Sequence, residues 1–257
     1  MTTIAPADLL ESVTQIATLS GEAILQIYAT DFSVRRKEDA SPVTEADERA
    51  ERIIVEGLSR LTPDIPIVAE EAVAAAKVPD ISCGRFWLVD PLDGTKEFIS
   101  RNGEFTVNIA LVEQGEPVLG VVLAPALGRL FAGARGVGAY VEDRNGRRPI
   151  HCRPVPECGL TVVASRSHGD EAALDRFLAG RKVAERVSAG SSLKLCLVAA
   201  GEADLYPRLG RTMEWDIAAG HAVLAAAGGK VVCVDSGRPL QYGKAGFDNP
   251  HFIASAA

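Results

Sequence analysis

The chain has 257 residues, of which 47% are hydrophobic, which is enough for a buried core in one large domain or two joined ones and excludes a disordered protein. The net charge of -7 is spread along the sequence without a cluster of Lys and Arg. This excludes an obvious docking patch for nucleic acid or an anionic membrane and favours a small-molecule partner. The five cysteines are scattered and include no C-x-x-C pair, which predicts reduced thiols. The N-terminus does not resemble a leader, and no apolar run is long enough to cross a membrane, so we expect a cytoplasmic location and no membrane span.

The N-terminal part of the chain begins with two predicted helices. Apolar residues recur at helical spacing between Asp8 and Tyr28, which predicts an amphipathic helix. After a charged loop, Thr44 and Asp47 have the spacing of a capping box, and the apolar positions that follow predict a helix that continues to Leu61. Asp47 is therefore expected in the first turn of the second helix.

Short β-type runs replace the helical pattern from Ile65 onward. Residues 65–69 and 86–89 each lead directly into acidic residues, so the strand ends are expected to deliver carboxylates. Residues 105–141 predict a largely antiparallel meander, because their apolar runs are separated by turn sequences. Its strands are expected near residues 106–112, 118–123, 130–134 and 139–141.

The polar, turn-rich segment at residues 143–149 is the best candidate for a domain boundary. It divides the chain into an N-terminal α+β domain, residues 1–147, and a C-terminal α/β domain, residues 148–257. Strands and helices alternate in the second domain, which puts ligand groups at element ends. Strands are expected at 160–164, 203–206 and 230–234, and helices near 171–178, 191–200 and 215–227.

The strand at 86–89 ends in the most informative stretch of the chain, Asp90-Pro91-Leu92-Asp93-Gly94-Thr95. Two carboxylates three residues apart, turned by Pro91, can converge on one point. Gly94 permits close approach of the backbone, and Thr95 adds a hydroxyl beside the same point. Oxygen ligands without nearby His or Cys select hard cations such as Mg2+ or Mn2+. The alternative interpretation is a turn with a solvated pair of Asp residues.

Two further acidic positions fit the same pocket. Glu70 follows the strand at 65–69, and Asp216 opens an Ala-rich helix, where the helix dipole favours a carboxylate. Taken alone, each has an ordinary alternative, because Glu70 could be a surface charge and Asp216 a helix cap. Together with the strand end, they predict one acidic pocket.

These motifs together resemble the inositol monophosphatase superfamily of lithium-sensitive, magnesium-dependent phosphatases. The resemblance covers essentially the whole chain and is carried by residues 41–47, 70–71, 87–95 and 215–220. Within the superfamily, the chain looks most like the 3'(2'),5'-bisphosphate nucleotidases of the CysQ type, at residues 94–98, 164–168 and 190–194.

The resemblance implies a fold of the α+β class, a layered αβαβα sandwich with metal ions between its two halves. It implies two or three Mg2+ ions. Their implied ligands are the side chains of Glu70, Asp90, Asp93 and Asp216 and the backbone carbonyl of Leu92. Asp47 and Thr95 match the positions that orient and activate the attacking water. At Ile217 and Ala69 the chain departs from close relatives, which often have hydroxyl residues at these positions. The difference affects hydrogen bonds around the metal ligands and leaves the ligands themselves unchanged.

The reaction that the resemblance implies is hydrolysis of adenosine 3',5'-bisphosphate to AMP and phosphate, with the sulfated analogue as a further substrate, in sulfur metabolism. The cleaved phosphate would contact Glu70, Leu92, Asp93, Gly94, Thr95 and Asp216. The second phosphate needs a cradle of its own. The candidates are Ser191, Ser192 and Lys194 at a helix start, with Arg208 and either Arg166 or His168 nearby. Ordinary helix capping and solvated surface charge are the alternatives for these residues.

Two other functions stay open at the level of the sequence. An inositol or sugar phosphate phosphatase would use the same metal motifs, although Lys96, Glu97 and the cluster at 191–194 favour the nucleotidase. A catalytically silent sensor of a phosphorylated metabolite would have no need of Asp47 and Thr95, which activate water. The oligomeric state is left open.

Overall fold

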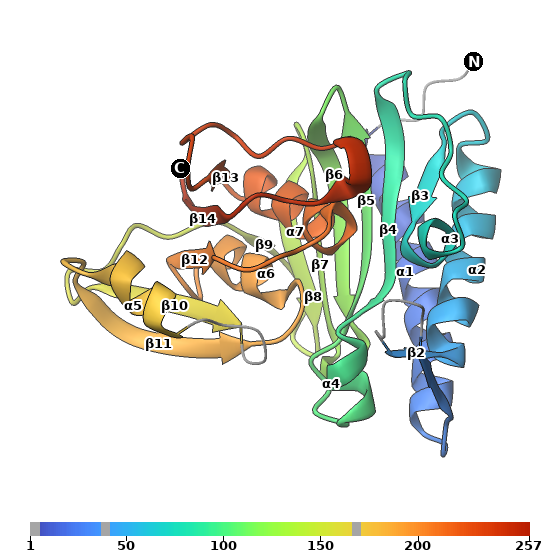
Figure 1. The fold of residues 1–257 in the computed structure, drawn as a ribbon, viewed down its shortest axis with the longest axis horizontal. Helices are drawn as coiled ribbons and strands as arrows, with labels where there is room; N and C mark the ends of the chain where they lie inside the picture. The colour runs from blue at the N-terminus through green and yellow to red at the C-terminus, as the bar shows by residue number, and fades with distance from the viewer. Residues whose placement is uncertain (1–5, 37–41, 166–170) are drawn as a thin grey trace.

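A computed structural model describes residues 6–36, 42–165 and 171–257. Helices and sheets alternate in five layers, in the order α, β, α, β, α (Figure 1). This is the layered α+β fold that the sequence predicted. Within the described ranges, no helix is both long and apolar enough to cross a membrane.

The first layer consists of the two predicted helices, α1 (Pro6–Tyr28) and α2 (Glu45–Leu61). They pack against each other and against one face of the first sheet, at the right of Figure 1. Val13 and Ile24 in α1 and Ile54 in α2 are completely buried there. Between the two helices, β1 (Val34–Arg36) pairs with β2 (Pro42–Thr44) in a short antiparallel ribbon.

The second layer is a seven-stranded sheet in which spatial order follows chain order. β3 and β4 are parallel, and every later neighbour is antiparallel, so the predicted meander is confirmed. The strands are β3 (Ile67–Ala69), β4 (Arg85–Asp93), β5 (Thr106–Glu113), β6 (Glu116–Ala124), β7 (Arg129–Ala134), β8 (Gly138–Asp143) and β9 (Gly146–Ile150). A 3-10 turn, η1 (Pro125–Leu127), joins β6 to β7.

The segment expected as a domain boundary forms a hairpin at the edge of this sheet. β8 ends at Asp143, and β9 returns beside it, with Arg147 opposite Glu142. Position 147 therefore lies within the first sheet, and the chain leaves that sheet only after Ile150. The division of the chain into two domains at this position stays a prediction.

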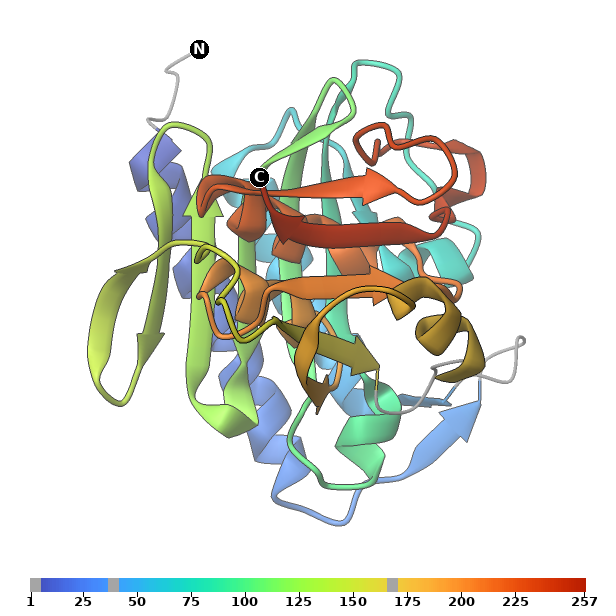
Figure 2. The same cartoon turned by 90° about the vertical axis from the view of Figure 1, so that its left-hand side faces the viewer.

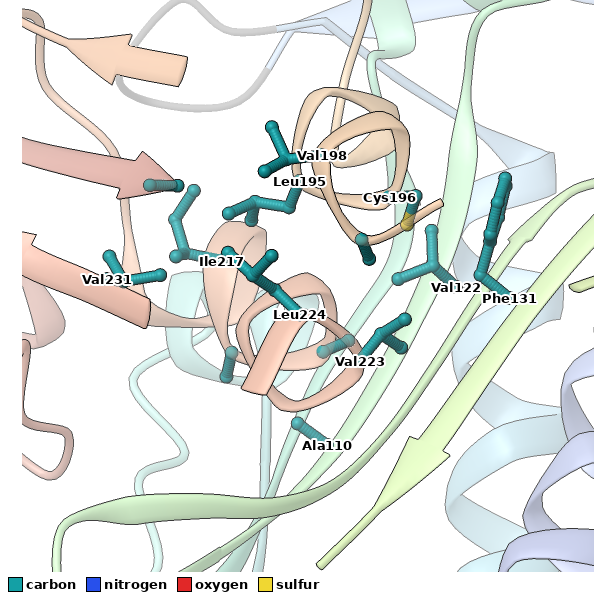
Figure 3. Packing of buried hydrophobic residues seen from close by; sticks show 14 of the residues in the cluster. Ala110, Val122, Phe131, Leu195, Cys196, Val198, Ile217, Val223, Leu224 and Val231 are labelled. Atoms are coloured by element: carbon teal, nitrogen blue, oxygen red, sulfur yellow. The ribbon is translucent and has the colours of Figure 1, made fainter. Parts of the chain in front are cut away.

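The middle layer contains α6 (Leu193–Ala199) and α7 (Glu214–Ala226), which lie between the two sheets. Figure 3 shows Val122 and Phe131 of the first sheet close to Cys196 and Val223, while Val231 of the second sheet lies near Ile217. α7 is apolar on all sides because both of its faces are covered. Gly120 makes this packing possible, since a Cβ there would lie 2.2 Å from the carbonyl oxygen of Ala219.

The fourth layer is a mixed five-stranded sheet in the order β11-β10-β12-β14-β13, which faces the viewer in Figure 2. β10 is parallel to β11 and β12, and β14 is antiparallel to β12 and β13. The strands are β10 (Leu160–Ser165), β11 (Val183–Ala189), β12 (Leu205–Arg208), β13 (Gly229–Cys233) and β14 (Phe252–Ala256). A 3-10 turn, η2 (Ala245–Phe247), precedes β14, and α5 (Glu171–Leu178) covers the outer face as the fifth layer.

Candidate active site and metal centre

Three of the predicted carboxylates lie where strands β3 and β4 of the seven-stranded sheet end. β3 and β4 run parallel, with Ala69 opposite Val89, so the residues that follow these positions meet at the same edge. Glu70 begins the short helix α3 (Glu70–Ala74) directly after β3. The pairing of β4 with β5 is interrupted between Asp90 and Asp93, and this irregularity brings both carboxylates to the strand end.

The fourth carboxylate comes from the middle layer. Asp216 lies in the first turn of α7, and its Oδ2 accepts a hydrogen bond from the backbone N–H of Met213 at 2.9 Å. The Ser192 hydroxyl connects this turn to β4, because its oxygen lies 2.5 Å from the carbonyl oxygen of Asp216 and 3.3 Å from Oδ2 of Asp93. The start of α7 is thus held against the strand end of β4.

The four carboxylates influence one another electrostatically. Burial raises the pKa of Asp90 well above its ordinary value, and the charges of Glu70, Asp93 and Asp216 raise it further. Burial also raises the pKa of Asp216, with Asp93 and Glu70 adding to the effect. The pKa of Asp93 is raised to about 6 by burial, although the Lys194 ammonium opposes the shift. The pKa values of these carboxyl groups are raised because several negative charges lie close together where water is largely excluded. Such a concentration of negative charge favours binding of a cation.

The oxygen atoms suit a hard cation. One oxygen of Asp90 accepts from the Leu92 N–H at 3.0 Å, and Asp93 and Asp216 likewise each have a single oxygen held by protein donors. Their second oxygens accept no hydrogen bond within the described part of the chain. As the side chains stand, however, the described residues contain no group of three or more His, Cys, Asp or Glu arranged to hold a metal ion. Ligation of one metal ion by these carboxylates would therefore require their side chains to move closer together.

Asp47 and Thr95, the residues predicted to activate water, lie together beside this centre. The predicted capping box is confirmed, because Oδ2 of Asp47 accepts from both the N–H and the hydroxyl of Thr44 at 2.8 Å. The Thr95 hydroxyl, at the start of α4 (Thr95–Ile99), lies 3.4 Å from Oδ1 of Asp47 and 3.5 Å from the carbonyl oxygen of Leu92. Asp47 is only 2% exposed, and burial raises its pKa although the bonds from Thr44 act in the opposite direction.

A tight contact joins the two halves of the chain next to Thr95. Gly94 has a φ of +91°, and a Cβ there would lie 2.3 Å from the Ser191 hydroxyl oxygen. Ser191 itself adopts a left-handed φ of 48°, and its hydroxyl lies 2.9 Å from the carbonyl oxygens of Asp93 and Glu104. Oε2 of Glu104 accepts from the Gly190 N–H at 2.8 Å. No sequence pattern pointed to Glu104, because only the folded chain brings it to residue 190.

The residues proposed to hold a second phosphate have different surroundings. Lys194 is 4% exposed, so the alternative of a solvated surface charge is excluded. Its ammonium donates to the carbonyl oxygens of Ala189 at 3.2 Å and Ser191 at 2.6 Å, and burial lowers its pKa to about 8. Arg208 donates to the carbonyl oxygen of Arg211.

A single cavity of about 370 Å³ opens onto both groups of residues. Among the predicted site residues, its lining includes Glu70, Asp93, Gly94, Thr95, Ser191, Lys194, Arg208 and Asp216. It also includes residues to which no sequence motif assigned a role, namely Ser165, Tyr206, Arg211 and Thr212. Asp90 and Ser192 are buried behind this wall. Arg166 and His168 lie outside the described residues.

Comparison with known proteins agrees with this geometry. The inositol monophosphatase family model matches residues 6–255. The chain is 52% identical over 225 residues to the 3'(2'),5'-bisphosphate nucleotidase CysQ of Salmonella typhimurium, which covers 87% of this chain and 89% of that protein. It is 48% identical over 250 residues to the protein of the same name from Escherichia coli K12. That alignment covers 96% of this chain and 99% of the Escherichia coli protein.

Solved structures share the same fold. CysQ from Bacteroides thetaiotaomicron superposes with a TM-score of 0.82 at 37% identity and covers 96% of both chains. Inositol monophosphatase from Anabaena superposes with a TM-score of 0.75 at 28% identity, covering 96% of this chain and 90% of the other.

Proposed function

The chain belongs to the inositol monophosphatase family, and we propose that it hydrolyses the 3'-phosphate of adenosine 3',5'-bisphosphate to give AMP and phosphate. The two CysQ relatives described above bear the name of this activity. The single observation that carries the proposal is that one cavity is lined both by the carboxylates Glu70, Asp93 and Asp216 and by the cations Lys194 and Arg208. A substrate with two separated phosphates can engage both at once. The sulfated analogue is a further candidate, and a cytoplasmic location stays a prediction.

Members of this family are metal-dependent and generally use Mg2+. We assign two or three ions to the side chains of Glu70, Asp90, Asp93 and Asp216, with the Leu92 carbonyl as a further ligand. The donor set fits, because it consists only of oxygens and three of its carboxylates each have an oxygen without a hydrogen-bond donor in the described structure. The bound cations would supply positive charge that neutralises the carboxylates and the phosphate oxygens.

Asp47 and Thr95 are assigned to the attacking water. The Thr95 hydroxyl can donate its hydrogen bond to Asp47, and its oxygen can then accept a hydrogen bond from a water on the cavity side and so orient that water. Thr44 fixes the Asp47 carboxylate through two hydrogen bonds, so the pair is oriented before substrate enters. The direction of attack is set by these two side chains.

The phosphate that is not cleaved is assigned to Ser191, Lys194 and Arg208. Two of the three Lys194 ammonium protons are used by backbone carbonyls, which leaves the third for a phosphate oxygen. Ser192 takes another role, because its hydroxyl is engaged by Asp93 and Asp216. It positions the carboxylate centre and does not need to touch the substrate.

The test is a comparison of kcat/KM with Mg2+ for adenosine 3',5'-bisphosphate, inositol 1-phosphate and fructose 1,6-bisphosphate. We expect the nucleotide to be preferred at least tenfold, because inositol 1-phosphate lacks a second phosphate and fructose 1,6-bisphosphate spaces its two phosphates differently. A higher kcat/KM for inositol 1-phosphate or fructose 1,6-bisphosphate would favour the alternative, an inositol or sugar phosphate phosphatase. Binding of the nucleotide without phosphate release from any substrate would favour a silent sensor.

A further inference from the structure

A second cavity, also of about 370 Å³, lies at the opposite edge of the seven-stranded sheet from the carboxylate centre. The catalytic edge contains Asp93 beside Thr106 at the start of β5, and β5 runs antiparallel to β6. The second cavity is lined by Glu116, Pro117 and Val118, which open β6 at the other edge. Its remaining wall comes from the C-terminal half of α7, the β7–β8 turn and residues 239–241.

His221 gives this cavity one well-defined polar group. The side chain is 8% exposed and lines the cavity, and its Nδ1 lies 2.9 Å from the Tyr242 hydroxyl. Tyr242 is buried, and its hydroxyl has no other hydrogen-bond partner among residues 6–36, 42–165 and 171–257. A buried hydroxyl proton has to be donated, so Tyr242 donates to Nδ1 and the imidazole proton resides on Nε2. Burial lowers the pKa of His221 to about 4, so the ring is neutral at pH 7.

The Nε2 atom of His221 is left available to a ligand. It has no hydrogen-bond partner among the described residues, and part of its surface remains accessible to solvent. In a wall that is partly apolar, a largely buried N–H of this kind favours an acceptor, because an unpaired buried donor costs free energy.

The rest of the wall determines what kind of molecule fits. Apolar surface comes from Pro117, Val118, Ala222 and Leu240. The charged groups at the rim are Arg135 and Glu116, which form an ion pair with each other at 2.5 Å. The wall therefore has no net charge, in contrast to the catalytic cavity with its carboxylates and cations. A phosphorylated nucleotide would find no cation there that is free of a carboxylate partner.

We propose that this cavity is a second binding site, which takes a small, uncharged, mainly apolar molecule with a carbonyl oxygen that accepts a hydrogen bond from Nε2 of His221. The apolar body of the ligand would lie on Ala222 and Leu240, and its carbonyl would point toward the imidazole. The site is separate from the catalytic centre and does not depend on the function proposed above.

Benzamide is a suitable probe, because it joins a flat apolar ring to one uncharged carbonyl group. The experiment titrates benzamide into the protein and follows the imidazole Nε2 and Hδ2 signals by NMR, with the His221→Phe spectrum identifying the signals of that residue. We expect the His221 signals to shift and to saturate at one benzamide per chain. Benzylamine has the same shape but is charged and lacks the carbonyl acceptor, so it should bind roughly tenfold more weakly.

Two variants test the imidazole donor and the cavity volume separately. His221→Phe removes the donor and should raise the Kd of benzamide by roughly two- to tenfold, the value of one hydrogen bond. Ala225 is exposed on α7 and lines the cavity, so Ala225→Leu should fill the cavity and abolish saturation while leaving phosphatase activity unchanged. That retained activity also shows that the variant is folded.

The proposal is overturned if the His221 signals do not respond to benzamide, or if Ala225→Leu binds benzamide as well as the unmodified chain. It is also overturned if benzylamine binds as tightly as benzamide, because the imidazole donor would then be irrelevant. Concentration-dependent dimerisation that Ala225→Leu abolishes, without any binding of benzamide, would assign the cavity to a second copy of the chain.

Discussion

Replacing Asp93 with Asn should stabilise the metal-free protein while it removes activity. In the folded chain the pKa of Asp93 is raised from 3.8 to about 6, mainly by burial and with a contribution from Glu70. A raised carboxyl pKa contributes stability that is fully present below the unfolded value and is lost as the pH rises through 6. About two pKa units correspond to a loss of about 3 kcal/mol at pH 8, as an upper limit.

An Asn side chain avoids this loss because it cannot ionise. Its amide oxygen can still accept from the hydroxyl of Ser192 and the side-chain amide of Asn108, which now contact Oδ2 of Asp93. In urea unfolding with EDTA, we therefore expect Asp93→Asn to exceed the unmodified chain by up to about 3 kcal/mol at pH 8 and by less than about 1 kcal/mol at pH 4. With saturating Mg2+, turnover should fall at least tenfold, as expected for loss of a metal ligand.

Asp204 provides a matched control with the opposite sign. Its buried carboxylate accepts from Arg153 at 2.8 and 3.1 Å and from the N–H of Thr161 at 2.7 Å, and these bonds lower its pKa although burial opposes them. A lowered pKa contributes stability above the unfolded value, so Asp204→Asn should destabilise the chain at pH 8. If Asp93→Asn were less stable than the unmodified chain at pH 8, or equally shifted at both pH values, the electrostatic reasoning would be refuted.

Three further substitutions test the catalytic cavity. Lys194→Ala should lower kcat/KM for adenosine 3',5'-bisphosphate by roughly ten- to a hundredfold, because a charged hydrogen bond is worth about 1.5–3 kcal/mol. It should barely affect kcat/KM for inositol 1-phosphate. Equal losses on both substrates would mean that Lys194 only holds its backbone turn. Gly94→Ala should lose at least about tenfold in kcat, because its Cβ would displace Ser191, and an unchanged kcat would show that the turn is deformable. Thr44→Val should cost about 1–2 kcal/mol in urea unfolding and lower kcat more than it raises KM, because it frees Asp47; wild-type kcat would contradict this role for the cap.

Features determined by short stretches of sequence were predictable. The capping box of Thr44 and Asp47 needs only a three-residue spacing, and both partners lie in one turn of chain. The positions of Asp90 and Asp93 at the end of β4 followed from an apolar run that ends in acidic residues. The bounds of the meander strands were close to the structure for the same reason, since nearly continuous apolar runs between turn residues leave a local pattern.

Features determined by long-range packing were not predictable. Lys194 is buried because α6 lies between two sheets, and no property of residues 190–194 reveals which layers cover them. The contacts of Glu104 with Gly190 and Ser191 likewise join segments that only the fold brings together. The segment at 143–149 is polar, and an exposed hairpin at a sheet edge has the same composition as a domain boundary, so composition alone does not reveal the hairpin.

The position of α7 between the two sheets also determines the order in which the catalytic centre can form during synthesis. Glu70, Asp90 and Asp93 leave the ribosome in the first half of the chain, whereas Ser192 and Asp216, which complete the centre, belong to its last third. Until α6 and α7 have emerged, the inner face of the seven-stranded sheet has no helix to cover it. The proposed set of ligands for Mg2+ is incomplete until α7 has emerged. The proposed ligand set is therefore complete only once α7 has been synthesised, which makes the catalytic centre one of the last parts of the nascent protein to be completed.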